Sequence, residues 1–372
     1  MRRQCFNFAV KSGGNTVLSS RTSGPCFIFM CVISGRRAKF PKRGIIMKKI
    51  LVLIVSALLM CGMVLGVSAC DSRVKVRVLQ YAEHGSLDNC YEGIVAGLEE
   101  KGYGSDVIDI TRINAKGSES DNTTYASSII NESPAVAVGI ATPSAYALAS
   151  AARGDVPVVF TAVSDPTAES ANFEAFDNVT GSSDKLPVES QLKLITDFFK
   201  TKDSARTEAV KIGIIYTRTE ANSVSHIAEF KALASQYNVE IVEAVVDTAT
   251  DIPLAIDSII AQVDCFNNLT DNNVVQNLDT LLDKADAAGK PVFGSEIEQV
   301  KKGCLASCSL DYFKLGKQTG YMIAEILGGK SANDIEFLYL TDGYSVDYNS
   351  TVAQTLGFTL PSDYEGANDA AA

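Results

Sequence analysis

Polar side chains stand where several apolar, β-branched runs of this sequence end. The first run leads into Glu83 and His84, and a later one into Thr142. Together the run ends supply the candidate ligand-binding residues, which are Glu83, His84, Thr142, Pro143, Ser164, Asp165, Asn222, Ser223, Asp271, Asn272, Ser295 and Glu296. Each cluster, taken alone, is also typical of a helix N-cap. Gathered at one edge of a sheet, however, hydroxyl, amide and carboxylate groups can bind a small polar molecule.

Enzyme and metal chemistry are not indicated. The sequence contains no G-x-S-x-G, H-E-x-x-H or G-x-G-x-x-G motif, and its two histidines are His84 and His226. Cys304 and Cys308 are close in sequence, but with so few histidines we favour buried free thiols over a zinc site. We therefore expect no catalytic residue, no metal ligand and no cofactor.

Short β-branched runs alternate with longer amphipathic segments, which is typical of parallel strands connected by helices. In the first half we expect strands over residues 74–81, 107–113, 135–141 and 156–163, and helices over 87–101, 123–131 and 143–153. The pattern restarts after residue 181, with strands over 210–216, 240–246, 264–269 and 291–294 and helices over 188–200, 224–237, 252–262 and 273–288. A strand over 305–310, a helix over 312–327 and a short strand over 337–340 follow.

The predicted fold class is α/β, with two Rossmann-like, three-layer lobes built on parallel sheets. We assign residues 70–184 to an N-terminal lobe, completed by about 305–335, and residues 185–304 to a C-terminal lobe, completed by about 336–362. Residues 363–372 are expected to form a disordered tail. Ligands of open α/β sheets bind at the carboxyl ends of the strands. The polar run ends are therefore expected to form two walls that face each other across a cleft.

Charge is divided unevenly along the chain. Residues 1–69 hold 11 of the 33 Lys and Arg and none of the 44 Asp and Glu, so the remainder carries a net charge of −22. A body this acidic repels phosphate backbones, and nucleic acid is not an expected partner.

An export signal is indicated at residues 47–69. Met47 is followed by two lysines, then by an uncharged apolar run, and the run ends in small residues before Cys70. This order is that of a secretory signal, and its ending resembles the lipobox of bacterial lipoproteins, in which the cysteine is acylated with diacylglycerol. A single membrane-spanning anchor is the alternative. Residues 1–46 precede this complete signal, and we interpret them as a misassigned upstream extension.

A family resemblance extends from about Val74 to Leu360. The residues that carry it are Leu79–His84, Ile140–Pro143, Val158–Pro166, Asn178–Asp184, Glu220–Val224, Thr270–Asn272 and Asp311–Gly316. These stretches resemble the ABC-transporter substrate-binding family that includes tryptophan- and tyrosine-binding lipoproteins. The resemblance implies a type I periplasmic-binding fold, in which two lobes are joined by three crossovers. It also implies that the ligand is an amino acid. Only the resemblance indicates that the ligand's side chain is aromatic.

For an amino-acid ligand we expect Thr142 and Ser164 to hold the carboxylate and Asp271 to hold the ammonium, with Glu83 as the second choice for the ammonium. Asn222 and Ser223 would complete the second wall, and Ser295 and Glu296 its rim. An aromatic ligand side chain would stack on one of three residues, Tyr81, Tyr146 or Phe266.

The implied protein is a monomer that is anchored by lipid to the outer face of the bacterial cytoplasmic membrane and delivers its ligand to an ABC importer permease. A ligand-sensing receptor with the same fold is the alternative, and a hydrolase is a weaker one.

Overall fold

The computed structural model describes residues 73–340 and 344–371. The expected upstream extension (1–46), the signal segment (47–69) and Cys70 lie outside the described residues. Within them, two α/β lobes are each built on a parallel sheet, which confirms the predicted fold class. No helix of the described part has the length and apolar character needed to cross a membrane.

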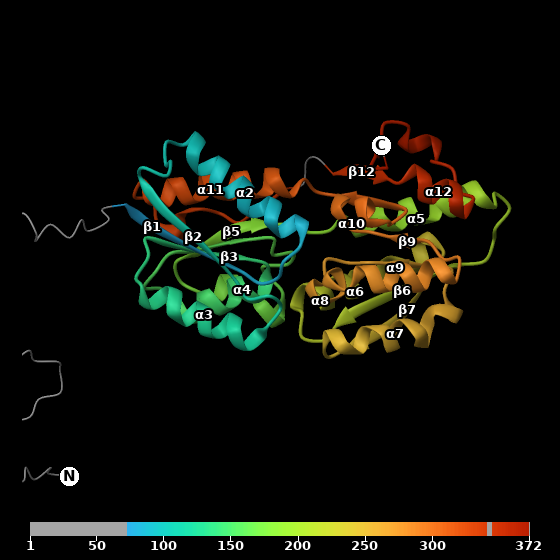
Figure 1. The fold of residues 1–372 in the computed structure, drawn as a ribbon, viewed down its shortest axis with the longest axis horizontal. Coiled ribbons are helices and arrows are strands. Elements are labelled where there is room, and N and C mark those ends of the chain that lie inside the picture. The colour runs from blue at the N-terminus through green and yellow to red at the C-terminus, as the bar shows by residue number, and fades with distance from the viewer. Residues whose placement is uncertain (1–72, 341–343, 372) are drawn as a thin grey trace, which may run out of the picture. The chain divides into compact units, whose positions relative to one another are not determined.

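The N-terminal lobe contains a sheet of six parallel strands. In spatial order they are β11 (Leu338–Tyr339), β5 (Val179–Ser183), β4 (Val158–Thr161), β3 (Val136–Ile140), β1 (Val74–Gln80) and β2 (Ile108–Asn114). Its helices are α2 (Gly85–Glu100), α3 (Glu119–Asn131), α4 (Thr142–Ala152) and α11 (Tyr312–Leu327). Strand β1 is buried on both faces: Val76 and Val78 pack with α2 and α11, and Leu79 packs with α3 and α4. Figure 1 shows these helix pairs on opposite faces of the sheet, so the lobe has three layers.

Glycines let α2 and α11 pack at close range. Gly93 and Gly97 of α2 face Gly316 and Gly320 of α11. A Cβ atom at Gly316 would collide with the backbone carbonyl of Cys90, and one at Gly320 would lie 2.6 Å from the carbonyl oxygen of Ile94. The contact between the two helices is therefore one of backbone against backbone.

The C-terminal lobe contains a second parallel sheet and a small mixed one. The parallel strands are, in order, β7 (Val239–Val246), β6 (Val210–Thr217), β8 (Cys265–Asn267) and β9 (Val292–Phe293). The small sheet is formed by β10 (Ala306–Ser309), β12 (Ser345–Tyr348) and β13 (Asn368–Asp369), with β10 antiparallel to β12. The helices are α5 (Val188–Lys202), α6 (Ala221–Leu233), α7 (Ile252–Ile259), α8 (Asn272–Gln276), α9 (Leu278–Ala287), α10 (Ile297–Lys302) and α12 (Ser350–Leu356). Residues of β6 serve both cores, because Ile212 and Ile214 belong to one hydrophobic cluster and Ile215 to the other.

The chain passes between the lobes three times, after β5, after β10 and between β11 and β12. Two assignments made from the sequence need correction. The strand predicted over 305–310 belongs to the C-terminal lobe, because β10 pairs with β12. The strand predicted over 337–340 belongs to the N-terminal lobe, because β11 pairs with β5. Sequence order could not show this, since each strand directly adjoins a crossover.

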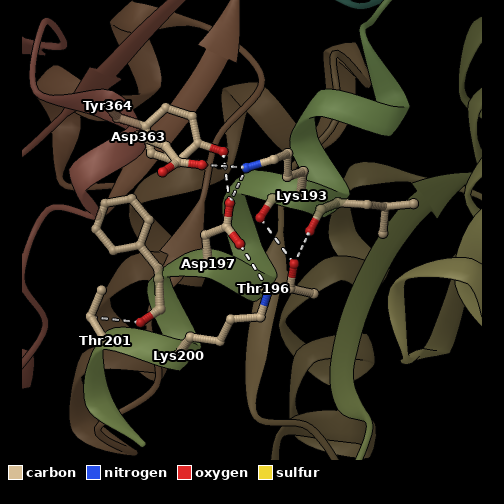
Figure 2. A network of polar contacts seen from close by, with 9 residues as sticks. Lys193, Thr196, Asp197, Lys200, Thr201, Asp363 and Tyr364 are labelled. Atoms are coloured by element: carbon tan, nitrogen blue, oxygen red, sulfur yellow. Dashed lines mark hydrogen bonds and ion pairs between the residues drawn. The ribbon is translucent and has the colours of Figure 1, made fainter. Parts of the chain in front are cut away.

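The C-terminal tail is ordered, contrary to the prediction of disorder from residue 363. Strand β13 pairs with β12, and Figure 2 shows a polar network that joins the tail to α5. Lys193 Nζ donates to Asp363 Oδ2 at 3.1 Å, and Tyr364 Oη donates to Asp197 Oδ2 at 3.1 Å. The tail was expected to fray because its composition is small and acidic. Asp363 and Tyr364 have partners on α5, which the composition does not reveal.

Replacing Gly316 with Ala tests the close packing of α2 and α11. The added methyl group must push the two backbones apart, and overpacking of this kind costs about 1–3 kcal/mol of unfolding free energy. Chemical denaturation followed by circular dichroism measures the loss. Gly366→Ala is the matched control, because a Cβ there meets nothing within 4 Å. Equal stability of the two variants would contradict the backbone contact described above.

Candidate functional site

Two connected spaces lie between the lobes. The inner cavity is lined by His84, Leu87, Ala141, Thr142, Ala162, Ser164, Asp184 and Tyr312 of the N-terminal lobe and by Asn222, Thr270, Asn272 and Glu296 of the C-terminal lobe. Its volume of about 10 Å³ leaves room for roughly one water molecule. The outer cleft has a volume of about 970 Å³ and shares Thr142 with the inner cavity. The lobes therefore nearly close the inner cavity and leave the outer cleft open.

Strand ends and helix starts position the side chains of the inner cavity. Thr142 begins α4 just after β3, and Asp184 directly follows β5. Ala141 and Ala162 have φ angles of 76° and 53°, which are unfavourable for residues with a Cβ. Both alanines line the inner cavity. Strained backbone tends to occur at ligand sites, and here it turns the chain sharply after β3 and β4.

Asp184 is the acid of the N-terminal wall. Only 3% of its surface is exposed. Its carboxylate accepts hydrogen bonds from Ser164 Oγ at 2.9 Å and from Tyr312 Oη at 2.8 Å. Burial raises the pKa of Asp184, these two hydrogen bonds lower it, and the charge of Glu296 raises it again, with a net upward shift. A carboxylate has about four acceptor positions, so about two remain for a donor in the cavity.

Glu296 is the acid of the opposite wall. It is 1% exposed, and its Oε1 accepts a hydrogen bond from Gln299 Nε2 at 3.1 Å. Its Oε2 has no hydrogen-bond partner among the described residues, and the same is true of His84 Nδ1, Asn222 Oδ1 and Thr270 Oγ1. Buried polar atoms normally have partners. Four such atoms around one cavity therefore indicate a polar ligand.

The lining of both spaces is acidic. Asp184 and Glu296 line the inner cavity, and the outer cleft adds Glu119, Glu220 and Asp247. None of the described residues that line either space is Lys or Arg. The cavity is therefore suited to a cationic group.

Six of the predicted site residues line the inner cavity, namely His84, Thr142, Ser164, Asn222, Asn272 and Glu296. Pro143 lines the outer cleft, together with two of the proposed stacking residues, Tyr81 and Tyr146. The third, Phe266, is 1% exposed and belongs to the hydrophobic core of the C-terminal lobe. Glu83 is exposed and lines neither space.

Asp271 lies at the start of α8 but does not face the cavity. Its oxygens accept hydrogen bonds from Thr217 N, Thr217 Oγ1, Ser223 Oγ and Val274 N at 2.7–3.1 Å. All four donors belong to its own lobe, so Asp271 stabilises the loop and is not placed to bind a ligand's ammonium. Ser223 is held in the same network. Ser295 likewise donates within its own lobe, to the Asn268 carbonyl oxygen.

The sequence did not reveal Asp184 and Tyr312 as site residues. Asp184 follows β5, a strand that was not predicted because Thr, Gly and two Ser follow its single Val. Tyr312 begins α11, which returns from the C-terminal lobe. Both residues lie in stretches that carry the family resemblance, and this was the one signal that could have identified them.

Asp165 connects the lobes outside both spaces. Ser225 Oγ of α6 donates to Asp165 Oδ2 at 2.5 Å. Burial raises the pKa of Asp165, but hydrogen bonds from Ser225 and Thr167 outweigh this and hold the pKa below its ordinary value. A second cross-lobe bond runs from Asn89 Nδ2 to Glu298 Oε1 at 3.3 Å. These bonds exist only while the lobes are together.

Removing the Ser225 hydroxyl should shift the protein toward an open arrangement. A hydrogen bond to a charged group contributes about 1.5–3 kcal/mol, and partial exposure of Asp165 reduces this. We therefore expect Ser225→Ala to lower the ratio of closed to open molecules about fivefold. Small-angle scattering should record a larger radius of gyration. Ser258→Ala, which removes a hydroxyl bonded only to the Ala255 carbonyl oxygen of its own helix, is the control. Identical scattering from both variants would mean that the bond does not hold the lobes together.

Sequence comparison identifies a family that covers nearly all of the described chain. The sequence model of the ABC transporter substrate-binding protein family matches residues 75–365. A protein of Clostridioides difficile named tyrosine-binding protein is 32% identical over an alignment of 307 residues, and the match covers 77% of this chain and 86% of that protein.

Two solved structures are similar at nearly the same sequence identity. One is the ABC domain from Streptococcus pneumonia in complex with L-Trp, which is 32% identical, has a TM-score of 0.74 and covers 80% of this chain and 99% of that one. The other is the ligand-free, open structure of a substrate-binding protein with adhesive properties from Clostridium difficile. It is 31% identical, has a TM-score of 0.60 and covers 80% of this chain and 98% of that one.

Proposed function

This chain belongs to the ABC transporter substrate-binding protein family, and we propose that it captures an aromatic amino acid between its two lobes. Proteins of this family bind solutes and are not enzymes. The observation that carries the proposal is the inner cavity, which Asp184 and Glu296 line from opposite lobes with no Lys or Arg among the described lining residues. An ammonium group placed between them would supply the missing positive charge.

The ligand's carboxylate would lie at the start of α4. The first N–H groups of a helix lack intrahelical partners, and the helix dipole favours an anion there. Thr142, at this position, lines both the inner cavity and the outer cleft. Its hydroxyl and the free backbone N–H groups are suited to a carboxylate. The ammonium and carboxylate of one α-amino acid would thus contact different walls.

The outer cleft would receive the side chain. Tyr81, Pro143 and Tyr146 line it, together with several alanines. Aromatic and apolar surfaces of this kind favour an aromatic ring. The named ligands of the two relatives, tyrosine and L-Trp, support the same side-chain class.

Ligand entry requires the lobes to separate, because the inner cavity has a volume of about 10 Å³. The TM-score is 0.74 against the L-Trp complex and 0.60 against the open, ligand-free structure. Since the two relatives are equally similar in sequence, the difference supports a lobe arrangement like that of the complex. Ligand binding would then select the closed state through contacts with both walls.

Neutralising either cavity acid should weaken binding. Asp184→Asn and Glu296→Gln each remove one negative charge from the ammonium site, and we expect at least a tenfold loss of affinity for L-Trp and L-Tyr by calorimetry. Asp257→Asn, at an exposed position of α7 that lines neither space, is the matched control and should bind normally. Unchanged affinity in both cavity variants would overturn the ammonium site. Tighter binding of L-Arg than of aromatic amino acids would overturn the side-chain class, and mass spectrometry of co-purified ligand gives an independent check.

We also propose that the protein is exported, is anchored by a lipid on Cys70 and delivers its ligand to an ABC importer permease. The basic start, apolar run and small residues before Cys70 support the anchor. Cys70→Ser should move the protein from the membrane fraction to the soluble fraction, because the acylated thiol is lost. Persistence of the variant in membranes would favour a spanning anchor instead.

The importer role is separable from ligand binding. Uptake of labelled ligand should fall when the protein is deleted and return when it is restored. Normal uptake in its absence would instead favour the ligand-sensing receptor.

A further inference from the structure

Glu220 lines the outer cleft, and one of its carboxyl oxygens has no hydrogen-bond partner among the described residues. The residue occupies the N-cap position of α6, yet its side chain makes no capping hydrogen bond. Instead, Oε2 accepts hydrogen bonds from Asn272 N at 3.0 Å, from Asn272 Nδ2 at 2.9 Å and from Asn222 Nδ2 at 3.5 Å. Oε1 has no hydrogen-bond partner among the described residues, although Glu220 is only 3% exposed to solvent. The proposed ammonium and carboxylate sites leave this oxygen unused.

Asp271, the neighbour of Asn272, decides the protonation state of Glu220. Burial raises the pKa of Glu220 well above its ordinary value, and the negative charge of Asp271 raises it further. Asp271 accepts four hydrogen bonds from its own lobe, so it is the better stabilised anion. Of the two acids, Glu220 is therefore the one that more readily holds a proton. Because Oε2 already accepts three N–H donors, a proton on Glu220 belongs on Oε1.

The surroundings of Glu220 define what this O–H group can meet. Tyr81 lines the same outer cleft from the opposite lobe, and burial raises the pKa of its hydroxyl. The Tyr81 hydroxyl is engaged, since it donates to the Gly117 carbonyl oxygen at 3.3 Å. Pro143 and Tyr146 add apolar surface. A ring bound in this cleft would therefore meet the lining residue Glu220, whose Oε1 is buried and has no partner among the described residues.

We propose that Glu220 selects the side chain of the ligand by donating a hydrogen bond from Oε1 to a hydroxyl on the aromatic ring. This inference rests on the proposed capture of an aromatic amino acid. A phenol oxygen accepts the hydrogen bond, whereas a phenyl ring leaves the buried O–H group unsatisfied. Sites built to bind a hydroxyl discriminate strongly against the analogue that lacks it. The protein therefore prefers L-Tyr to L-Phe.

The test compares L-Tyr and L-Phe by calorimetry on the purified full chain and its variants. The wild-type protein is expected to bind L-Tyr at least about tenfold more tightly than L-Phe. Glu220→Ala should bring this ratio to within about threefold of one. Glu220→Gln should keep most of the preference, because its amide N–H group can donate in place of the Oε1 hydroxyl. Thr270→Val is the control for disturbance of the C-terminal wall, because it removes a hydroxyl of the inner cavity that does not contact Glu220, and it should weaken both ligands while leaving their ratio unchanged.

The ratio of the affinities for L-Tyr and L-Phe distinguishes hydrogen bonding by Glu220 from a purely structural role. A distorted wall would weaken the binding of both amino acids to the same extent. A wild-type ratio near one, or a preference that survives Glu220→Ala, overturns the selection by Glu220. Equal losses of preference in Glu220→Gln and Glu220→Ala overturn its role as donor. Failure of the wild-type protein to bind either amino acid would instead contradict the proposed function.

Discussion

The site depends on the burial of two carboxyl groups that line one cavity from opposite lobes, where none of the described lining residues is Lys or Arg. Asp184 and Glu296 come from different lobes and are 3% and 1% exposed. Bringing them together removes both from water and places like charges near each other, and both effects disfavour the closed state. A ligand that carries an ammonium group replaces the repulsion between the two carboxylates with attraction of both to its positive charge. Closure is thus coupled to the charge of the ligand, and the free energy that shifts the equilibrium comes from contacts with both walls.

The rest of the fold makes this coupling possible because each lobe is rigid near the cavity. Tyr312 holds Asp184 from α11, a helix fixed against α2 by backbone contact at four glycines. Gln299 holds Glu296 from within α10. Each acid is oriented by its own lobe, so separation of the lobes moves the two walls apart without disordering either. The cross-lobe bond between Ser225 and Asp165 lies outside the cavity, and it adjusts the equilibrium without touching the ligand.

Much of the architecture follows from hydrophobic periodicity. The alternation of strands and helices predicted both parallel sheets, and helix α11 was placed at its observed bounds. Strand β5 was missed because its sequence, VTGSS, is small and polar although all of its residues are buried. The helix expected over 273–288 is two, because the Asn277 side chain donates to the Asn273 carbonyl oxygen and the backbone leaves the helical conformation there. The lobe assignments near the crossovers depend on pairing between distant strands, which local sequence does not specify.

The site residues were partly predictable for a related reason. The rule that ligands bind at strand ends located His84, Thr142, Asn222 and Glu296 but could not distinguish residues that face the cavity from those that face the lobe. Asp271 and Glu220 show why, since each is an acid at the start of a helix. Asp271 accepts hydrogen bonds from four donors of its own lobe and therefore has a structural role. Glu220, in contrast, has one carboxyl oxygen that accepts hydrogen bonds and one that has no partner among the described residues. Only the three-dimensional count of hydrogen bonds separates the structural acid from the acid that can meet a ligand. That count also makes Asp271 the better stabilised anion, which supports the proposal that Glu220 acts as the donor.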